Sequence, residues 1–295
     1  MPESEPNLRE SADSTVPPGG GFRVRTMAMA PVLLVGAPRS GTTWLQRTLL
    51  SLPECCGGQE SHALCTVAKV VEDFDRKAAM ERPHGLAAHL TRPELIEQMR
   101  CFWLATMTPS IAAAPTAVRL LEKTPDHAVH LDLARELLPE ARVIHLVRDP
   151  CDVVASLMSA SRRSWGAGWA PATVESATSR WIECVDAAEA SGARFDSGRF
   201  LTIRYEDLQR DPRTAFTSIL RLLELPMDRV EALKIASESG GAEIPLFGQL
   251  AERSSEEPAG FLGGSPPLGP WARRKVMRLV GDRYSTLGVA PRSGS

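Results

Sequence analysis

Hydrophobic positions divide the chain into short apolar runs and longer segments in which apolar residues recur at helical spacing. Four runs have the length and apolar character of buried strands, at residues 32–35, 118–122, 143–147 and 200–205. Helical spacing predicts helices over residues 42–52, 93–107, 126–138, 150–159, 172–190, 212–225, 228–237 and 271–282. This alternation predicts an α/β fold of three layers, with a central parallel sheet flanked by helices on both faces.

Polar segments indicate how this domain is delimited. Residues 1–29 are polar, then rich in Pro and Gly, and we expect them to be disordered. Residues 30–295 are predicted to form one domain, in which residues 240–270, rich in Gly, Ser, Pro and Glu, form a mobile loop or lid. Residues 53–60, 67–93 and 159–171 are interpreted as loops, the last two as variable loops that would contact a substrate.

Composition narrows the classes of function. The net charge of −2 argues against a general nucleic-acid binder, which would carry a basic excess on one face. No apolar stretch is long enough to span a bilayer and no signal sequence is recognisable, so we expect a cytoplasmic protein without a membrane span. The six cysteines include no C-x-x-C pair and no His partner at zinc-finger spacing, so no metal is predicted. The sequence does not indicate an oligomeric state.

Candidate chemistry gathers at the ends of the predicted strands. Gly36, Lys123, Arg148 and Tyr205 each lie at or just after the carboxyl end of one strand. In open parallel sheets, ligands bind beyond these carboxyl ends. One crevice is therefore expected to collect all four residues.

The most informative motif is the loop Gly36–Thr43, which stands between the first strand and the first helix. Its glycines keep the spacing of a nucleotide-triphosphate loop, but Thr42 occupies the lysine position and Thr43 the Ser/Thr position. Backbone N–H groups and the positive end of the following helix still form an anion cradle, and Arg39 adds a positive charge. A cradle without the lysine that reaches the β- and γ-phosphates suits a ligand with a 5′-phosphate and no triphosphate tail.

These residues resemble the sulfotransferases that use 3′-phosphoadenosine 5′-phosphosulfate (PAPS), in particular the branch of tyrosylprotein sulfotransferases and their bacterial relatives. The resemblance covers Val32 to Leu225 and implies a P-loop-type fold. It implies that the 5′-phosphate is held by the loop residues Arg39, Ser40, Gly41, Thr42 and Thr43. The segment Val-Ile-His-Leu-Val-Arg-Asp-Pro at 143–150, with Ser156 after it, matches the family's 3′-phosphate strand and helix, which gives that role to Arg148 and Ser156.

The resemblance also implies the catalytic residues. The family's general base, a Glu after the loop that follows the first helix, corresponds to Glu60. His62 is the alternative base, because some sulfotransferases use His and its ordinary pKa suits the task. Lys123, within Glu-Lys-Thr-Pro at 122–125, is expected to stabilise the leaving group and the sulfuryl oxygens, with Arg39 assisting. A solvated lysine at a strand end is the competing interpretation.

Two further donor contacts follow from the resemblance. Tyr205 lies in Arg-Tyr-Glu-Asp-Leu at 204–208, which matches another family segment. Trp181 falls where the family pattern places a residue near the adenine, although a core role is at least as compatible with its position. The family's Lys- and Thr-rich closing segment is not recognisable in residues 243–258. Arg148 also has a competing interpretation, a salt bridge with an acidic neighbour at the sheet rim, either Asp149 or Glu206.

Together these inferences predict a PAPS-dependent sulfotransferase that moves a sulfuryl group, without a metal, onto a hydroxyl-bearing acceptor: a small molecule, a glycan or a peptide. A P-loop kinase of a small metabolite is one alternative, disfavoured by Thr42 in the lysine position and by the lack of a clear Walker B aspartate. A catalytically decayed nucleotide-binding protein is the other alternative. The presence of Arg39, Lys123, Arg148 and Ser156 weighs against it.

Overall fold

The structure of the protein is a computed structural model that describes residues 29–244 and 266–287. The expected disordered segment, residues 1–29, lies outside the described residues except for Met29. Most of the expected lid at 240–270 also lies outside them. Both expectations therefore stay predictions.

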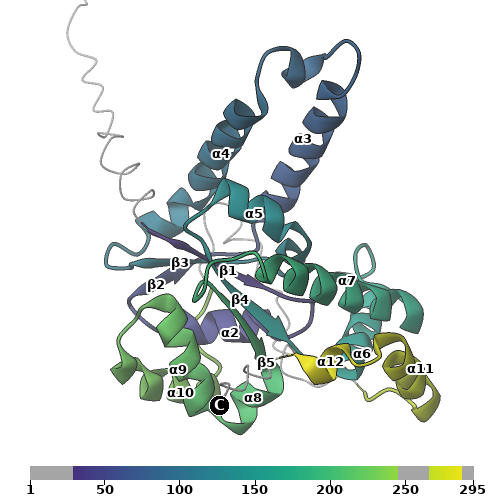
Figure 1. Ribbon diagram of the computed structural model, residues 1–295. Coiled ribbons are helices and arrows are strands. Elements are labelled where there is room, and N and C mark those ends of the chain that lie inside the picture. The colour runs from purple at the N-terminus through teal and green to yellow at the C-terminus, as the bar shows by residue number, and fades with distance from the viewer. Residues whose placement is uncertain (1–28, 245–265, 288–295) are drawn as a thin grey trace, which may run out of the picture.

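A parallel sheet occupies the centre of the molecule (Figure 1). Its strand order is β2-β3-β1-β4-β5, and every neighbouring pair is parallel. The strands are β1 Pro31–Val35, β2 Cys55–Gly57, β3 Arg119–Lys123, β4 Arg142–Val147 and β5 Phe200–Arg204. The four predicted strands are confirmed. The interpretation of residues 53–60 as a loop is wrong for β2, which is only three residues long and pairs with β3 alone, so its pattern is too short to recognise.

Side chains alternate along the strands and form a core on each face of the sheet. In β1, Val32 and Leu34 belong to one buried cluster, and Leu33 and Val35 belong to the other. The first cluster is closed by the helical elements α2 Thr42–Leu49, α8 Tyr205–Arg210, α9 Pro212–Leu223 and α10 Val230–Ser239, with the 3₁₀ turn η3 Met227–Arg229 joining α9 and α10. Helices thus cover both faces, and the predicted three-layer α/β fold is confirmed.

More helices cover the second face (Figure 1). In chain order these elements are α3 Ala63–Ala78, η1 Gly85–Ala88, α4 Arg92–Ala112, η2 Pro125–His130, α5 Leu131–Leu137, α6 Pro150–Ser161, α7 Val174–Gly192, α11 Pro270–Val280 and α12 Arg283–Thr286. The predicted helix at 126–138 is a 3₁₀ turn followed by α5. None of the helices in the described part of the chain is long and apolar enough to cross a membrane.

The interpretation of residues 67–93 as a variable loop is wrong, because residues 67–78 belong to α3 and residues 85–88 to η1. Leu64, Val67, Ala68, Val71 and Phe74 recur at helical spacing and are buried in α3. Helix α4 begins with a capping box, in which the Thr91 N–H donates to Glu94 Oε2 at 2.7 Å, and continues to Ala112. Figure 1 shows α3 and α4 side by side, projecting away from the sheet.

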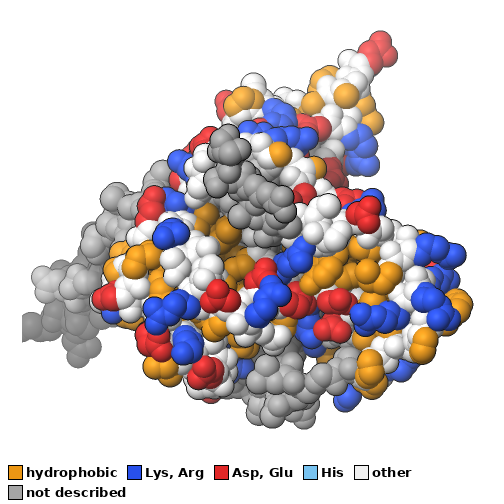
Figure 2. All heavy atoms as spheres, turned by 60° about the horizontal axis from the view of Figure 1, so that its bottom comes forward, with side chains coloured by type: hydrophobic (Ala, Val, Ile, Leu, Met, Phe, Trp, Pro, Cys, Tyr) orange, Lys and Arg blue, Asp and Glu red, His pale blue; other side chains and the backbone are white. Residues whose placement is uncertain are grey.

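Charged side chains of both signs are interspersed among the described residues on the face that Figure 2 shows. Hydrophobic side chains are visible between them. This mixture agrees with the small net charge of the chain.

Candidate active site

The loop after β1 is shaped by two glycines that no other residue could replace without a shift. A Cβ on Gly36 would lie 2.3 Å from the carbonyl oxygen of Leu146 in β4. Gly41 is the N-cap of α2 with φ of 97°, and a Cβ there would lie 2.8 Å from the ring of Tyr205. The first helical N–H groups of α2 therefore stand at the carboxyl end of the sheet, as an anion cradle requires.

Arg39 connects this loop to a distant helix. Its Nε donates to Ser156 Oγ in α6 at 3.0 Å, and its guanidinium lies 5.6 Å from the ring centre of Trp165. Arg39 itself has φ of 77°, an uncommon conformation for a residue other than glycine. Burial lowers the pKa of Arg39, and the positive charge of Arg148 lowers it further, while Glu60 acts in the opposite direction. The positive charges of the two guanidinium groups therefore act on each other.

Arg148 follows β4 and has the second of these guanidinium groups. It lies 4.7 Å from the ring centre of Tyr205, and its Nη2 donates to Asp152 Oδ2 at 3.3 Å. Its carbonyl oxygen accepts from Trp181 Nε1 at 3.1 Å. Its acidic partner is therefore one turn along α6, not Asp149 or Glu206. Asp149 instead caps α6 by accepting from the N–H of Cys151 and Asp152.

Two atoms of the predicted phosphate-binding residues are buried without a partner. Ser40 Oγ and Arg148 Nε have no hydrogen-bond partner among the described residues. Buried polar atoms in folded proteins nearly always have one. Thr42, the first residue of α2, is also buried.

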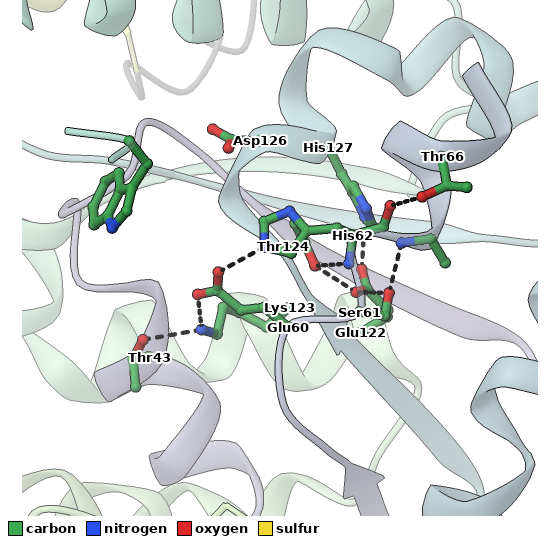
Figure 3. A network of polar contacts seen from close by, with 12 residues as sticks. Thr43, Glu60, Ser61, His62, Thr66, Glu122, Lys123, Thr124, Asp126 and His127 are labelled. Carbon is green, nitrogen blue, oxygen red and sulfur yellow. Dashed lines mark hydrogen bonds and ion pairs between the residues drawn. The ribbon is translucent and has the colours of Figure 1, made fainter. Parts of the chain in front are cut away.

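Lys123 ends β3 and is only 4% exposed, so the competing interpretation of a solvated lysine is wrong. Its Nζ donates to Thr43 Oγ1 at 3.0 Å and forms an ion pair with Glu60 (Figure 3). Glu60 is 36% exposed, and its other oxygen lies 3.6 Å from His62 Nε2. The two candidate bases and the candidate lysine therefore lie together, next to the loop after β1.

Glu122 precedes Lys123 and faces the opposite side of the sheet, where it meets Ser61, Thr124 and His127 (Figure 3). Burial raises the pKa of Glu122, but the charge of His127 and the hydrogen bonds outweigh it and lower the pKa to about 2. Burial lowers the pKa of His127, yet the charge of Glu122 and a contact with Cys65 raise it to about 9. A charged pair is therefore buried directly behind the candidate bases.

The structure brings most of the predicted site residues together: Arg39, Ser40, Gly41, Thr42, Thr43, Glu60, His62, Lys123, Arg148, Ser156 and Tyr205. Trp181 is different, because its side chain is 0% exposed. Its indole packs in the core and holds the Arg148 backbone, so it supports the site without a surface for a ligand. The sequence analysis gave no role to Ser61, Glu122, Thr124 or His127, because only their contacts across the fold reveal them.

Comparisons with known proteins point to one family. The model of the sulfotransferase family matches residues 31–229. Protein-tyrosine sulfotransferase 1 of Danio rerio is 23% identical over 278 residues, which cover 89% of this chain and 73% of that protein. The nodulation protein NoeE of Sinorhizobium fredii is 33% identical over 135 residues, which cover 45% of this chain and 31% of that protein. The chain spans 38% of a matching protein-tyrosine sulfotransferase of Drosophila melanogaster.

Solved structures share the fold. The sulfotransferase domain from the curacin biosynthetic pathway superposes with a TM-score of 0.54 at 17% identity, covering 90% of this chain and 94% of that one. Sulfotransferase STF9 of Mycobacterium avium superposes with a TM-score of 0.53 at 17% identity, covering 89% and 78%.

Proposed function

The chain belongs to the sulfotransferase family, and from this premise we propose that it transfers a sulfuryl group from PAPS to a hydroxyl of a small molecule, glycan or peptide. The observation that carries the proposal is the hydrogen bond from Arg39 Nε to Ser156 Oγ, at 3.0 Å. It joins the loop after β1 to the helix after β4, the two segments to which the family resemblance gives two different phosphates. A nucleotide phosphorylated at both the 5′ and the 3′ positions needs two such sites side by side.

The residues present fit this donor. Ser40 Oγ and Arg148 Nε are buried without a partner among the described residues, and phosphate oxygens would accept from both. The neighbouring positive charges of Arg39 and Arg148 repel each other, and a bound anion relieves that repulsion. The N–H groups at the start of α2 suit the 5′-phosphate, and Arg148 with Ser156 suits the 3′-phosphate.

PAPS, when bound, supplies a sulfuryl group on a phosphate leaving group. Glu60 accepts the proton of the acceptor hydroxyl, for which its exposure of 36% leaves it accessible. Lys123, held by Thr43 and Glu60, donates to the oxygen on which negative charge develops. Because Lys123 is almost completely shielded from water, its charge is worth more there than at the surface. His62 is the alternative base, 3.6 Å from Glu60.

We also propose a cytoplasmic location. Among the described residues, Cys55, Cys151 and Cys184 are buried thiols that form no disulfide. A reducing compartment maintains such thiols. Fractionation with compartment markers tests this proposal, and recovery of the protein in an oxidising compartment would contradict it.

Thermal unfolding tests the donor. We expect adenosine 3′,5′-bisphosphate to raise the melting temperature and ATP with Mg²⁺ not to raise it. A ligand that binds only the folded protein stabilises it by about 2.7 kcal/mol when present at a hundred times its Kd. Stabilisation by ATP with Mg²⁺ alone would favour the kinase alternative. Stabilisation by neither would favour the decayed nucleotide-binding protein.

Mass spectrometry tests the reaction. The protein is incubated with PAPS and extracts that contain hydroxyl-bearing compounds, and the products are searched for the mass of one added sulfuryl group. We expect a product that depends on both protein and PAPS. A boiled sample provides the control, and the absence of any such product across phenolic, sugar and peptide acceptors would contradict the proposed transfer.

A further inference from the structure

A buried ion pair lies behind the segment that carries both candidate bases. Glu122 Oε2 and His127 Nδ1 are 2.7 Å apart, and the two side chains are 2% and 0% exposed. Burying a charged pair has a large desolvation cost, and apolar residues of similar volume are often as stable. Stability alone therefore does not account for this pair.

The other contacts of Glu122 lead to the segment of residues 58–62. Glu122 Oε1 accepts from Ser61 Oγ at 2.8 Å and from Thr124 Oγ1 at 2.7 Å. Thr124 Oγ1 accepts in turn from the backbone N–H of His62 at 3.3 Å. Ser61 lies between Glu60 and His62, so one carboxylate oxygen is connected to the backbone from which both candidate bases project (Figure 3).

The backbone needs support at this point. His62 has φ of 49°, in the left-handed region that residues other than glycine rarely adopt. It is the N-cap of α3, but its side chain caps no N–H group. Ser61 Oγ accepts from the N–H of Ala63 at 3.1 Å instead. The conformation that brings Glu60 to Lys123 therefore depends on Ser61, and Ser61 is held by Glu122.

We propose that the Glu122–His127 pair is a positioning device for residues 58–62, which acts through the hydroxyls of Ser61 and Thr124. The proposal rests on the proposed function, in which Glu60 or His62 accepts the proton. Glu122 holds the two hydroxyls through one oxygen, and His127 fixes the other oxygen so that the carboxylate keeps its orientation. Cys65 in α3 also contacts His127.

The molecule contains a matched pair elsewhere. His145 Nδ1 lies 3.0 Å from Glu189 Oε1, which also accepts from Thr202 Oγ1 at 2.6 Å. This pair joins β4, α7 and β5, and its contacts with Thr202 lie outside residues 58–62. Glu189→Gln therefore makes the same chemical change in a pair of the same residue types.

The experiment compares Glu122→Gln, Ser61→Ala and Glu189→Gln in the full chain. It measures kcat, the KM for PAPS and amide hydrogen exchange of residues 58–64. We expect Glu122→Gln and Ser61→Ala to lower kcat by about 10- to 100-fold with an unchanged KM for PAPS, because small misplacements of a reacting group have effects of this size. Amide hydrogen exchange of residues 58–64 should become faster in both of these variants. Glu189→Gln should change neither kcat nor this exchange.

Combination and rescue sharpen the result. The double variant of Glu122→Gln and Ser61→Ala should have a kcat no lower than that of the slower single variant, because both substitutions remove the same contact. Thr124→Ser keeps the hydroxyl and should retain kcat, whereas Thr124→Val should lower it. Additive losses in the double variant, or equal losses in the two Thr124 variants, would overturn the proposal.

The remaining outcomes are also decisive. Unchanged kcat, a fall in kcat without faster exchange, or an equal fall in Glu189→Gln overturns the positioning role while leaving the proposed function intact. If Glu122→Gln does not fold, Ser61→Ala decides, because it alters only a partly exposed hydroxyl. If the unaltered protein transfers no sulfuryl group, the proposed function fails, and exchange of residues 58–64 alone then supports or overturns the positioning.

Discussion

The two sides of the site are built in different ways. The donor side consists of residues 36–43 with Arg148 and Ser156, and the acceptor side consists of residues 58–64 with the end of β3. On the donor side, residues 36–43 form a tight loop and a helix start whose shape is local in the sequence, and the long-range contact of Arg39 with Ser156 joins this loop to α6. The acceptor side depends on pairs more than sixty residues apart, Ser61 with Glu122 and Glu60 with Lys123.

The two sides also differ in the charges that they bring together. On the donor side, Arg39 and Arg148 repel each other, and two buried polar atoms have no partner among the described residues. On the acceptor side, opposite charges meet: Glu122 Oε1 accepts from two hydroxyls and Oε2 forms an ion pair with His127. Glu122 Oε2 and both ring nitrogens of His127 are nevertheless buried atoms without a hydrogen bond among the described residues. We infer that the donor side is completed by its ligand, whereas the acceptor side is preorganised by the protein. Variants on the two sides should therefore affect different quantities.

The largest effect is expected for Glu60→Gln, which keeps the shape of the side chain and removes the base. We expect kcat to fall by at least about a hundredfold, the typical contribution of general acid-base catalysis. Affinity for adenosine 3′,5′-bisphosphate, measured by calorimetry, should stay the same because Glu60 belongs to the acceptor side. Weakened binding of the bisphosphate in this variant would mean that Glu60 also contributes to the donor side.

His62→Ala is the matched comparison for this prediction. Near-normal kcat in Glu60→Gln together with a collapse in His62→Ala would assign the base to His62. Near-normal kcat in both variants would place the base elsewhere in the chain.

Lys123 lies where the two sides meet, because it contacts Thr43 from one side and Glu60 from the other. We expect Lys123→Met to lower kcat by about 10²- to 10³-fold, as the loss of a group that stabilises developing charge does. Single-turnover measurements with saturating PAPS isolate the chemical step. A variant that loses donor affinity but keeps the single-turnover rate would make Lys123 a binding residue of the donor side only.

Arg148→Ala should weaken binding of the bisphosphate, which Glu60→Gln should leave unchanged. A charge-assisted hydrogen bond contributes about 1.5–3 kcal/mol, so affinity for the bisphosphate should fall by about 10- to 100-fold. The preference for the bisphosphate over adenosine 5′-monophosphate should disappear, and calorimetry measures both. Arg163→Ala, in the exposed turn after α6, is the control. If Arg148→Ala still discriminates by the same factor, Arg148 does not bind the 3′-phosphate.

The donor side could be predicted from the sequence because each of its two segments is a local motif, although the contact of Arg39 with Ser156 that joins them is not local. The glycine spacing determines the loop, and Arg148 with Ser156 occupies a strand end and the next helix, which apolar runs reveal. Glu60 and Lys123 were predicted from motifs, but their direct ion pair was not.

The acceptor side was harder to predict for three physical reasons. Helix α3 starts without a capping side chain at His62, so its beginning has no local signal. Strand β2 has three residues, too few for a period. The pairing of His127 with Glu122 has no local signal, because it requires the turn η2 to fold back over the end of β3.

The smallest expected effect concerns Cys65, a partly buried thiol in α3 behind the acceptor side. Burial raises its pKa, but hydrogen bonds and charges from His127 and His130 outweigh it and lower the pKa from 9.0 to about 6. At pH 7 the thiolate fraction is then about a hundredfold larger, while the nucleophilicity of each thiolate falls by about 15- to 30-fold. The net gain in the alkylation rate is about three- to sixfold, before any loss from limited access.

The pH dependence of that alkylation decides whether the charged network behind the acceptor side exists in solution. A lowered thiol pKa makes the rate rise through pH 6 and level off above it, whereas an ordinary thiol keeps gaining up to pH 8 or 9. Mass spectrometry after iodoacetamide treatment at a series of pH values measures the profile at Cys65. His130→Asn should move the midpoint upward by removing one of the two imidazoles. A midpoint near that of a peptide thiol in the unaltered protein would mean that the acceptor side lacks this preorganised charge, which would remove the main difference between the two sides.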